Sequence, residues 1–459
     1  MKKLLQQLSD KRVQQPLLIS AGIVLGYWGL RKLLRPRIPI ISGFAAKYLC
    51  SQLFISKIPI EKILKEDLGF FPVNLADFTI DMENKTVSSS VLGHSRKTAV
   101  YREGLGAMLH HAIPRKHLPE YDKLKDAKIV PLEKQFNGTS HSAMPVEAEN
   151  IKMKDAIAAA FKEGNMFSPK NTRAVVVMHK GKIIGEQYAE GINVDTPLLG
   201  WSMTKSILSA LVGILHRQGK LDLRDPVPMK AWKHSDKKDI TWRHLLQMNS
   251  GLDWKEDYGG VETVNTMLFD SEHMARYALR RKRKYPAGGY FCYSSGDSNI
   301  LSYLMAQQFD SLEEYWEFPY KELFGKLGMD SMFMETDAGG HFVTSSYTYG
   351  TARDWAKFGQ LYLNDGTWDG NEILSHDWLE FTKREAPNSE GHYGGHFWLN
   401  KGGEMPDVPR DAFFANGFHG QRLTVIPSLE LVILRMGVTY RRNGFDFNKW
   451  TKGIIEALR

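Results

Sequence analysis

Ser202 and Lys205 form the pattern Ser-x-x-Lys within the stretch SMTK. Side chains three residues apart share one face of a helix, so the lysine amine can reach the serine hydroxyl. A serine hydroxyl becomes a strong nucleophile only when a neighbouring base takes its proton. A lysine can be that base if burial or a nearby cation keeps it neutral. The pair therefore indicates a serine nucleophile activated by a lysine.

The residues around Ser202 predict the start of a buried helix. Gly200 precedes the serine, Gly219 ends the segment, and an apolar stripe lies between them. The stripe consists of Ile207, Leu208, Leu211, Ile214 and Leu215. At a helix start, the positive end of the dipole favours an alkoxide or an oxyanion. The alternative is a helix-capping serine followed by an incidental lysine.

The four-residue pattern is weak by itself, because Ser235 and Lys238 also match it. That second copy lies in the charged stretch HSDKKD, with no apolar helix behind it. We interpret it as chance.

A second group of candidate residues is Tyr293-Ser294-Ser295, which follows a Gly-Gly turn and precedes an expected helix. A tyrosine on a loop can share a proton with a lysine, and the Ser295 hydroxyl can hydrogen-bond the lysine or a substrate. The alternative is a core tyrosine beside a helix cap. We expect Asp297 to cap that helix.

A third group is the stretch GFHGQ, which runs from Gly417 to Gln421 into an expected edge strand. Its glycines let the backbone approach a ligand, and an edge strand offers N–H groups to an oxyanion. His419 can be read as a general base, but a pocket or packing role is the stronger expectation.

Other chemistry finds no support in the sequence. There is no HExxH, no two-histidine-plus-acid run, no phosphate loop and no dinucleotide fingerprint. His392 and His396 are four residues apart, but glycines between them argue against a helix. Two cysteines, Cys50 and Cys292, exclude a disulfide framework, and we expect Cys50 to be a buried structural residue. We expect neither a metal nor a cofactor.

Composition describes an ordinary globular chain of 459 residues, 42% of them hydrophobic. Lysine and arginine exceed the acids by 60 − 52 = 8, a mild excess that permits attraction to an anionic membrane but does not argue for nucleic acid. The basic run 280–284 is expected to be a solvated helix end.

The expected elements place strands at both ends of the main region and helices between them. One antiparallel sheet built from both ends, with a helical insertion over 202–390, fits this order. The expected hairpins are 174–180 with 182–188, and 422–427 with 431–437; helices are expected over 151–161 and 447–458.

Residues 13–30 carry no charge and end near two interface-type aromatics, which predicts an uncleaved signal anchor. A cleaved signal and a buried or interfacial helix are the alternatives, and basic residues on both sides leave the orientation open. The expected organisation is an anchor and basic flank over 1–40, an extension packed on the main domain over 41–140, and a hydrolase domain over 141–459. A polar linker is expected at 131–150.

Five ordered blocks resemble the class C β-lactamase-like serine hydrolases, a superfamily that includes DD-peptidases, family VIII esterases and aminohexanoate-oligomer hydrolases. The last two groups are the most similar. The blocks are SMTKSILSALVGIL, HLLQMNSGLDW, YFCYSSGDSNILSYLM, SSYTYGTARDWAKFGQLYL and FFANGFHGQRLTVIP. The resemblance implies an α+β fold: an antiparallel β-sheet flanked by helices plus a helical subdomain, with the active site between them.

By this resemblance Ser202 is the nucleophile, Lys205 its base, and Tyr293 the group that relays protons to the leaving group. Ser295 stands where class C enzymes hold an asparagine, and the third block departs from their Lys-Thr-Gly motif. The oxyanion N–H groups are expected at Ser202 and Phe418. Expected substrate contacts are Ser295, His419, Trp398 and Tyr393.

The expected reaction is hydrolysis of an ester or a linear amide. Residues 413–420 contain neither the lysine nor the threonine that would bind a substrate carboxylate, which disfavours β-lactams. The alternatives are a β-lactamase or DD-peptidase, a non-catalytic acyl-binding sensor on the same fold, and a membrane-bound structural protein. Many relatives work in the bacterial periplasm, where we expect the anchored hydrolase domain.

Overall fold

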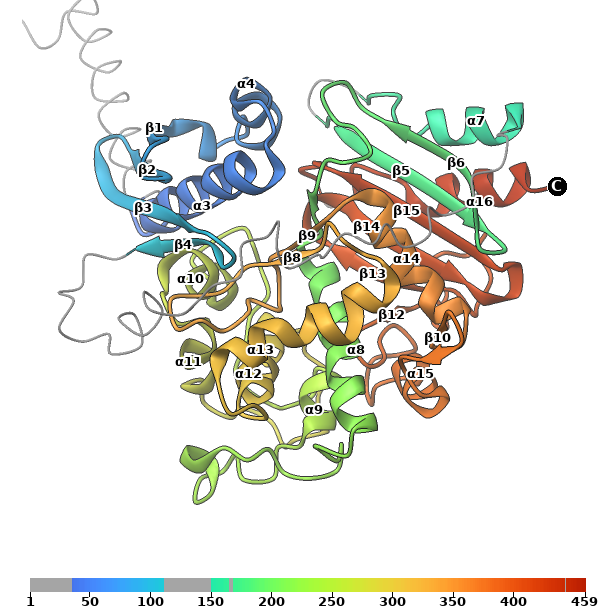
Figure 1. The fold of residues 1–459 in the computed structure, drawn as a ribbon. Coiled ribbons are helices and arrows are strands. Elements are labelled where there is room, and N and C mark those ends of the chain that lie inside the picture. The colour runs from blue at the N-terminus through green and yellow to red at the C-terminus, as the bar shows by residue number, and fades with distance from the viewer. Residues whose placement is uncertain (1–34, 111–149, 165–167, 442) are drawn as a thin grey trace, which may run out of the picture.

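A computed structural model describes residues 35–110, 150–164, 168–441 and 443–459 (Figure 1). The predicted anchor at 13–30 and nearly all of the predicted linker at 131–150 lie outside the described residues. Both therefore remain predictions.

A six-stranded antiparallel sheet forms the centre of the main domain, in the order β12-β13-β14-β15-β5-β6. Because β15 pairs with β5, the two ends of the domain meet in one sheet, as predicted. One detail of the prediction is wrong: β14 lies between β13 and β15 and is not an edge strand. The strands are β5 (Thr172–His179), β6 (Lys182–Tyr188), β12 (Trp398–Leu399), β13 (Phe413–Gly417), β14 (Gln421–Ile426) and β15 (Leu431–Gly437).

Helices cover both faces of this sheet, so β5 is buried on both sides. Alternate side chains of a strand point to opposite faces: Val175 and Val177 join one buried cluster, Val176 and Met178 the other. Figure 1 shows α7 and α16 together on the outer face. The covering helices are α7 (Ile151–Ala158) and α16 (Phe447–Ala457) on one face, and α14 (Ala352–Leu363) on the other. Helix α8 (Thr204–Arg217) belongs to the same buried cluster as α14 and packs against α12.

The chain between α8 and β12 builds the helical region and most of two small sheets, β10-β11 and β7-β9-β8, of which only β7 precedes α8. Its first part packs beside α8 and carries the Tyr293 loop into α12. The helices are α9 (Trp242–Leu246), α10 (Thr263–Asp270), α11 (Met274–Leu279), α12 (Ser295–Ala306), α13 (Leu312–Pro319) and α15 (His376–Lys383). The short strands are β7 (Leu198–Leu199), β8 (Phe333–Met334), β9 (Thr348–Gly350), β10 (Thr367–Trp368) and β11 (Asn371–Glu372).

Residues 35–110, here called the N-terminal unit, pack the helix α3 against a four-stranded antiparallel sheet, with the short helix α4 (Ile60–Lys62) between them in the chain. Helix α3 packs on this sheet and also contacts α10 of the helical region. The predicted boundary after residue 40 falls inside α3, and Cys50 is fully buried there, as expected. The elements are α3 (Ile38–Ser51), β1 (Ala76–Asp81), β2 (Thr86–Val91), β3 (His94–Arg102) and β4 (Gly106–His110).

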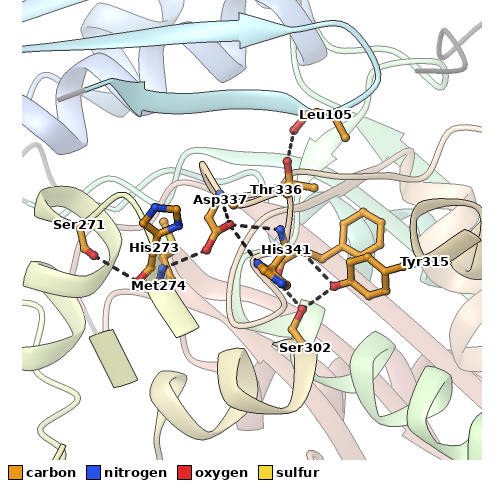
Figure 2. A network of polar contacts seen from close by, with 12 residues as sticks. Leu105, Ser271, His273, Met274, Ser302, Tyr315, Thr336, Asp337 and His341 are labelled. Atoms are coloured by element: carbon orange, nitrogen blue, oxygen red, sulfur yellow. Dashed lines mark hydrogen bonds and ion pairs between the residues drawn. The ribbon is translucent and has the colours of Figure 1, made fainter. Parts of the chain in front are cut away.

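Two polar joints hold the N-terminal unit to the main domain. In the first, the buried Lys47 ammonium of α3 lies 2.6 Å from a carboxylate oxygen of Glu335. Figure 2 shows the second, where the Thr336 hydroxyl donates to the Leu105 carbonyl. Within the main domain, the neighbouring Asp337 accepts from the Met274 N–H and so anchors this loop to α11. The ion pair of Lys47 and Glu335 therefore has a structural role.

Within the described residues, one helix is long and apolar enough to cross a membrane, the 19-residue segment Ile38–Ser56. In its most apolar 18-residue stretch, 83% of the residues are buried inside the fold, as they would be in a core helix. It therefore gives only weak support to membrane attachment, and it is not the predicted anchor.

Candidate active site

Ser202 lies in a tight 3₁₀ turn, Trp201–Met203, that leads directly into α8. The serine is half-buried at the start of the helix, as predicted. Trp201 has a left-handed φ of 49°, a rare conformation for a bulky residue. Gly200 leaves room for this turn, because a Cβ there would lie 2.3 Å from the Trp355 ring. Such local strain is often found at functional sites.

The Lys205 amine is 1% exposed and contacts three oxygens. Its Nζ lies 2.9 Å from Ser202 Oγ, 3.1 Å from Ser295 Oγ and 2.8 Å from the Ser345 carbonyl. The structure thus brings three predicted residues, Ser202, Lys205 and Ser295, into one cluster. The Ser345 carbonyl, from the fourth block of the resemblance, was not predicted as part of it.

Glu256 is a further member of the cluster that sequence reasoning missed. Its carboxylate accepts from the Ser295 hydroxyl at 2.5 Å and from the Ser295 N–H at 2.9 Å. The Trp254 indole and the Tyr258 hydroxyl donate to it at 2.6 and 3.1 Å. Four donors therefore fix this carboxylate on the far side of Ser295 from Lys205.

The order of these hydrogen bonds determines where a neutral Lys205 directs its lone pair. The Ser295 proton goes to Glu256, because a carboxylate can only accept. Ser295 must then accept from the lysine, and the Ser345 carbonyl must do the same. A neutral amine has two N–H groups, and these two oxygens use both. Its lone pair therefore faces Ser202 Oγ.

Electrostatics assign different protonation states to Lys205 and Tyr293. Burial lowers the pKa of Lys205 to about 8, although the Glu256 carboxylate opposes this shift. Burial and the same carboxylate raise the pKa of Tyr293 above its usual value. Near neutral pH the phenol keeps its proton, while a useful fraction of the lysine is neutral. This favours the lysine as the base.

Tyr293 stands beside this cluster. Its ring centroid lies 4.9 Å from Lys205 Nζ, and its hydroxyl hydrogen-bonds with Ser202 and Trp398. Trp398 and Tyr393 pack on the ring at centroid distances of 5.1 and 5.6 Å. Trp398 is half-buried, whereas Tyr393 is 1% exposed and packs edge-on against the Tyr293 ring.

The expected cap of the helix after Tyr293 is wrong. Ser294 caps α12, with its hydroxyl accepting from the Asp297 N–H. Asp297 lies in the first turn instead, where its carboxylate accepts from Ser250 and Ser294. Burial raises the pKa of Asp297 to about 7.

The backbone at Gly417 touches the turn that holds Ser202. A Cβ on Gly417 would lie 2.2 Å from the Gly200 carbonyl oxygen, so only glycine permits this approach. Phe418 follows it and packs edge-on against Trp201 at 5.4 Å. The contact brings the β13–β14 turn to the turn that holds Ser202.

His419 contacts aromatic rings rather than the Lys205 cluster. It has a φ of 63° and is stacked on Phe418, with Phe70 of the N-terminal unit edge-on at 6.0 Å. Burial, assisted by the positive charge of Arg173, lowers its pKa to about 3. A neutral, enclosed imidazole agrees with the packing role.

The remaining sequence signals lie outside this cluster. The Ser235 hydroxyl bonds the Trp232 carbonyl in a turn. In the basic run, Arg283 forms a surface ion pair with Asp239. Buried His396 hydrogen-bonds Ser298 at 2.9 Å. Across the described ranges, no group of three or more histidines, cysteines or acids could hold a metal.

Comparisons with known proteins identify the family of this chain. The family model described as Beta-lactamase matches residues 170–452. A 6-aminohexanoate-dimer hydrolase of Paenarthrobacter ureafaciens is 26% identical over 294 residues, covering 58% of this chain and 72% of that protein.

Solved structures share the fold. A 6-aminohexanoate-dimer hydrolase homologue from Bacillus anthracis superposes with a TM-score of 0.57 at 21% identity, over 70% of this chain and 87% of that one. A family VIII carboxylesterase gives 0.52 at 17% identity, over 68% and 98%. At these identities the superpositions establish the fold alone.

Proposed function

Since the chain belongs to the Beta-lactamase family of hydrolases, we propose that it cleaves an ester or a linear amide through an acyl-enzyme on Ser202. The observation that carries the proposal is the order of hydrogen bonds around Lys205. That order directs the lysine lone pair at the Ser202 hydroxyl. A serine with its base already aligned is the requirement for nucleophilic catalysis.

The reaction proceeds in two halves. Lys205 Nζ takes the Ser202 proton as Oγ bonds to the substrate carbonyl carbon, and the carbonyl oxygen becomes an oxyanion. The oxyanion then collapses, and the proton passes from Lys205 through Tyr293 to the leaving alcohol or amine. In the second half a water gives a proton to the same groups and attacks the acyl carbon. Ser202 recovers its proton as the carboxylic acid departs.

Two backbone N–H groups are suited to stabilise the oxyanion. Ser202 lies at the N-terminal end of α8, where the helix dipole favours negative charge. Phe418 directly follows Gly417, the last residue of β13, whose backbone contacts Gly200. Removing one such donor from an acyl-transfer site costs roughly 10² to 10³ in rate.

The surroundings of Arg422 and His419 support a substrate without a carboxylate, rather than a β-lactam. These are the two side chains that could take the place of the missing carboxylate-binding lysine and threonine. The Arg422 guanidinium lies between the rings of Phe414 and Phe447 and donates to Asn416. His419 is buried with a lowered pKa. Both are therefore engaged elsewhere.

Labelling with a fluorophosphonate tests the nucleophile. The wild type should be labelled and Ser202→Ala should not be, while the matched variant Ser235→Ala should behave as wild type. Absence of labelling in the wild type, with a folded protein, would favour the non-catalytic acyl-binding sensor.

A comparison of kcat/KM on nitrophenyl butyrate and nitrocefin tests the substrate class. We expect the ester to be hydrolysed and nitrocefin to be turned over weakly or not at all. A clear preference for nitrocefin would place the enzyme among the β-lactamases.

The proposed location is a membrane, through residues 13–30, with the hydrolase domain in the bacterial periplasm. The uncharged run of the sequence supports this proposal. Deletion of 1–34, which leaves α3 whole, should release a soluble and active enzyme. Full-length protein that fractionates as soluble with its N-terminus intact would contradict the anchor.

A further inference from the structure

Helix α3 forms one wall of an apolar cavity beside the active site. The cavity holds about 120 Å³, against the 10–15 Å³ or so that one ordered water needs. Ile40, Ile41 and Phe44 line it from α3, and Phe269 of α10 faces them. A cavity of this size with so apolar a lining suits a hydrocarbon group better than water.

Tyr258 and Phe418 lie between this cavity and the catalytic cluster. Both line it, and their rings stack with centroids 4.6 Å apart. The Tyr258 hydroxyl donates to Glu256, which in turn bonds Ser295. Phe418 also contacts Trp201, the residue before the nucleophile. The stacked rings of Tyr258 and Phe418 thus lie between the cavity and the cluster, and one of them must turn aside for a chain on Ser202 to enter the cavity.

We propose, resting on the proposed function, that this cavity is the subsite for an unbranched apolar acyl chain of the substrate. The leaving group departs towards Tyr293, whose ring packs against Trp398 and Tyr393. The cavity instead adjoins Phe418, on the oxyanion side. The chain left on the serine after the leaving group has gone is the acyl chain.

The wall that α3 contributes lies outside the part of the chain that the family model matches, which begins at residue 170. The N-terminal unit would therefore select the substrate without taking part in the chemistry.

A chain-length series tests the subsite in the full-length enzyme. With nitrophenyl esters of straight-chain acids from two to ten carbons, kcat/KM should rise by about fourfold per buried methylene until the cavity is full, and then fall. Ile41→Phe should move the optimum to shorter acids, and Ile41→Ala should move it to longer ones. Opposite shifts cannot come from a shared folding defect.

Ile38→Ala is the matched control, because Ile38 is buried on the same helix but does not line the cavity. It should leave the optimum unchanged. An enzyme labelled at Ser202 whose optimum stays fixed in both Ile41 variants would overturn the subsite alone.

A second series, acetate esters of straight-chain alcohols, separates the acyl chain from the leaving group. Shifts that appear only in the alcohol series would overturn the acyl assignment. Failure of Ser202 to label would overturn the proposed function, and the subsite with it.

Discussion

Two buried lysines, Lys47 in the N-terminal unit and Lys205 in the hydrolase domain, have the same kinds of neighbour in a different order. Lys47 contacts the Glu335 carboxylate directly at 2.6 Å and the Ser51 hydroxyl at 2.9 Å. At Lys205 the Ser295 hydroxyl lies between the amine and the carboxylate of Glu256.

The difference shows how one hydroxyl changes the role of a buried amine. At Lys47 the Glu335 carboxylate is in direct contact, and the two form an ion pair. The Glu335 carboxylate also accepts hydrogen bonds from the Ser51 hydroxyl and the Ala107 N–H. An interposed serine keeps the charge of Glu256 one residue away and leaves the lone pair of Lys205 free for Ser202. The first arrangement holds two parts of the fold together, and in the proposed mechanism the second prepares a base.

Replacement of Lys205 should give the largest effect on activity. Lys205→Met removes the base, and Lys205→Arg supplies a guanidinium that does not deprotonate. We expect kcat/KM on nitrophenyl butyrate to fall at least ~10³-fold, or about 4 kcal/mol, with the fold intact by circular dichroism. Turnover within about tenfold of wild type would show that Lys205 is not the base.

The corresponding variant Lys47→Met should act on stability instead. It leaves the Glu335 carboxylate, which is 0% exposed, without its cation. Breaking a buried pair in this way costs about 3–5 kcal/mol, which urea unfolding would measure. We expect kcat of the folded protein to stay near wild type. The double variant Lys47→Met/Glu335→Gln should recover part of the loss, and a fully additive result would contradict a coupled pair.

The sequence predicted the contact between Ser202 and Lys205 that the structure shows, because this part of the candidate site is local. Ser202 and Lys205 are three residues apart, so their contact is local and an apolar stripe marks their helix. Glu256 could not be found this way, since it reaches Ser295 across 39 residues from a loop of mixed charge. No spacing rule connects such a pair.

The fold shows the same division. The two hairpins of the main sheet are runs of branched apolar residues and were predicted with nearly correct ends. The sheet of the N-terminal unit was not recognised. In β2, a serine, Ser89, occupies a buried position between Val87 and Val91, so the apolar alternation that marks a strand is interrupted.

Removing the two hydroxyls should separate the two roles further. Ser295→Ala takes away the group that fixes the lysine lone pair, and we expect kcat to fall about 10- to 100-fold with KM little changed. Ser51→Ala should cost about 1 kcal/mol of stability and leave kcat unaltered. Equal losses of activity in both variants would contradict the comparison.

The smallest expected effect is a shift in pH dependence. The base works when neutral, so kcat/KM should rise with pH, with its midpoint near the Lys205 pKa of about 8. The Glu256 carboxylate stabilises the ammonium and so raises that pKa. Glu256→Gln removes the charge, the lysine loses its proton more readily, and the rising limb should move to lower pH.

The pH at which kcat/KM rises, and not its maximal value, reports the effect of the Glu256 charge on Lys205. The amide of Glu256→Gln can keep its oxygen on the N–H groups of Ser295 and Trp254, but its NH2 then donates to the Ser295 hydroxyl. The Ser295 proton is then free to turn to Lys205 and compete with Ser202 for the lone pair, so the maximal rate will also fall. Glu262→Gln is the matched control, because its carboxylate pairs with exposed Lys255 near the same loop. It makes the same change in net charge away from Lys205, and its limb should stay in place. An unmoved limb in Glu256→Gln would mean that Ser295 insulates the base from the carboxylate, and that Glu256 acts only by holding the hydroxyl.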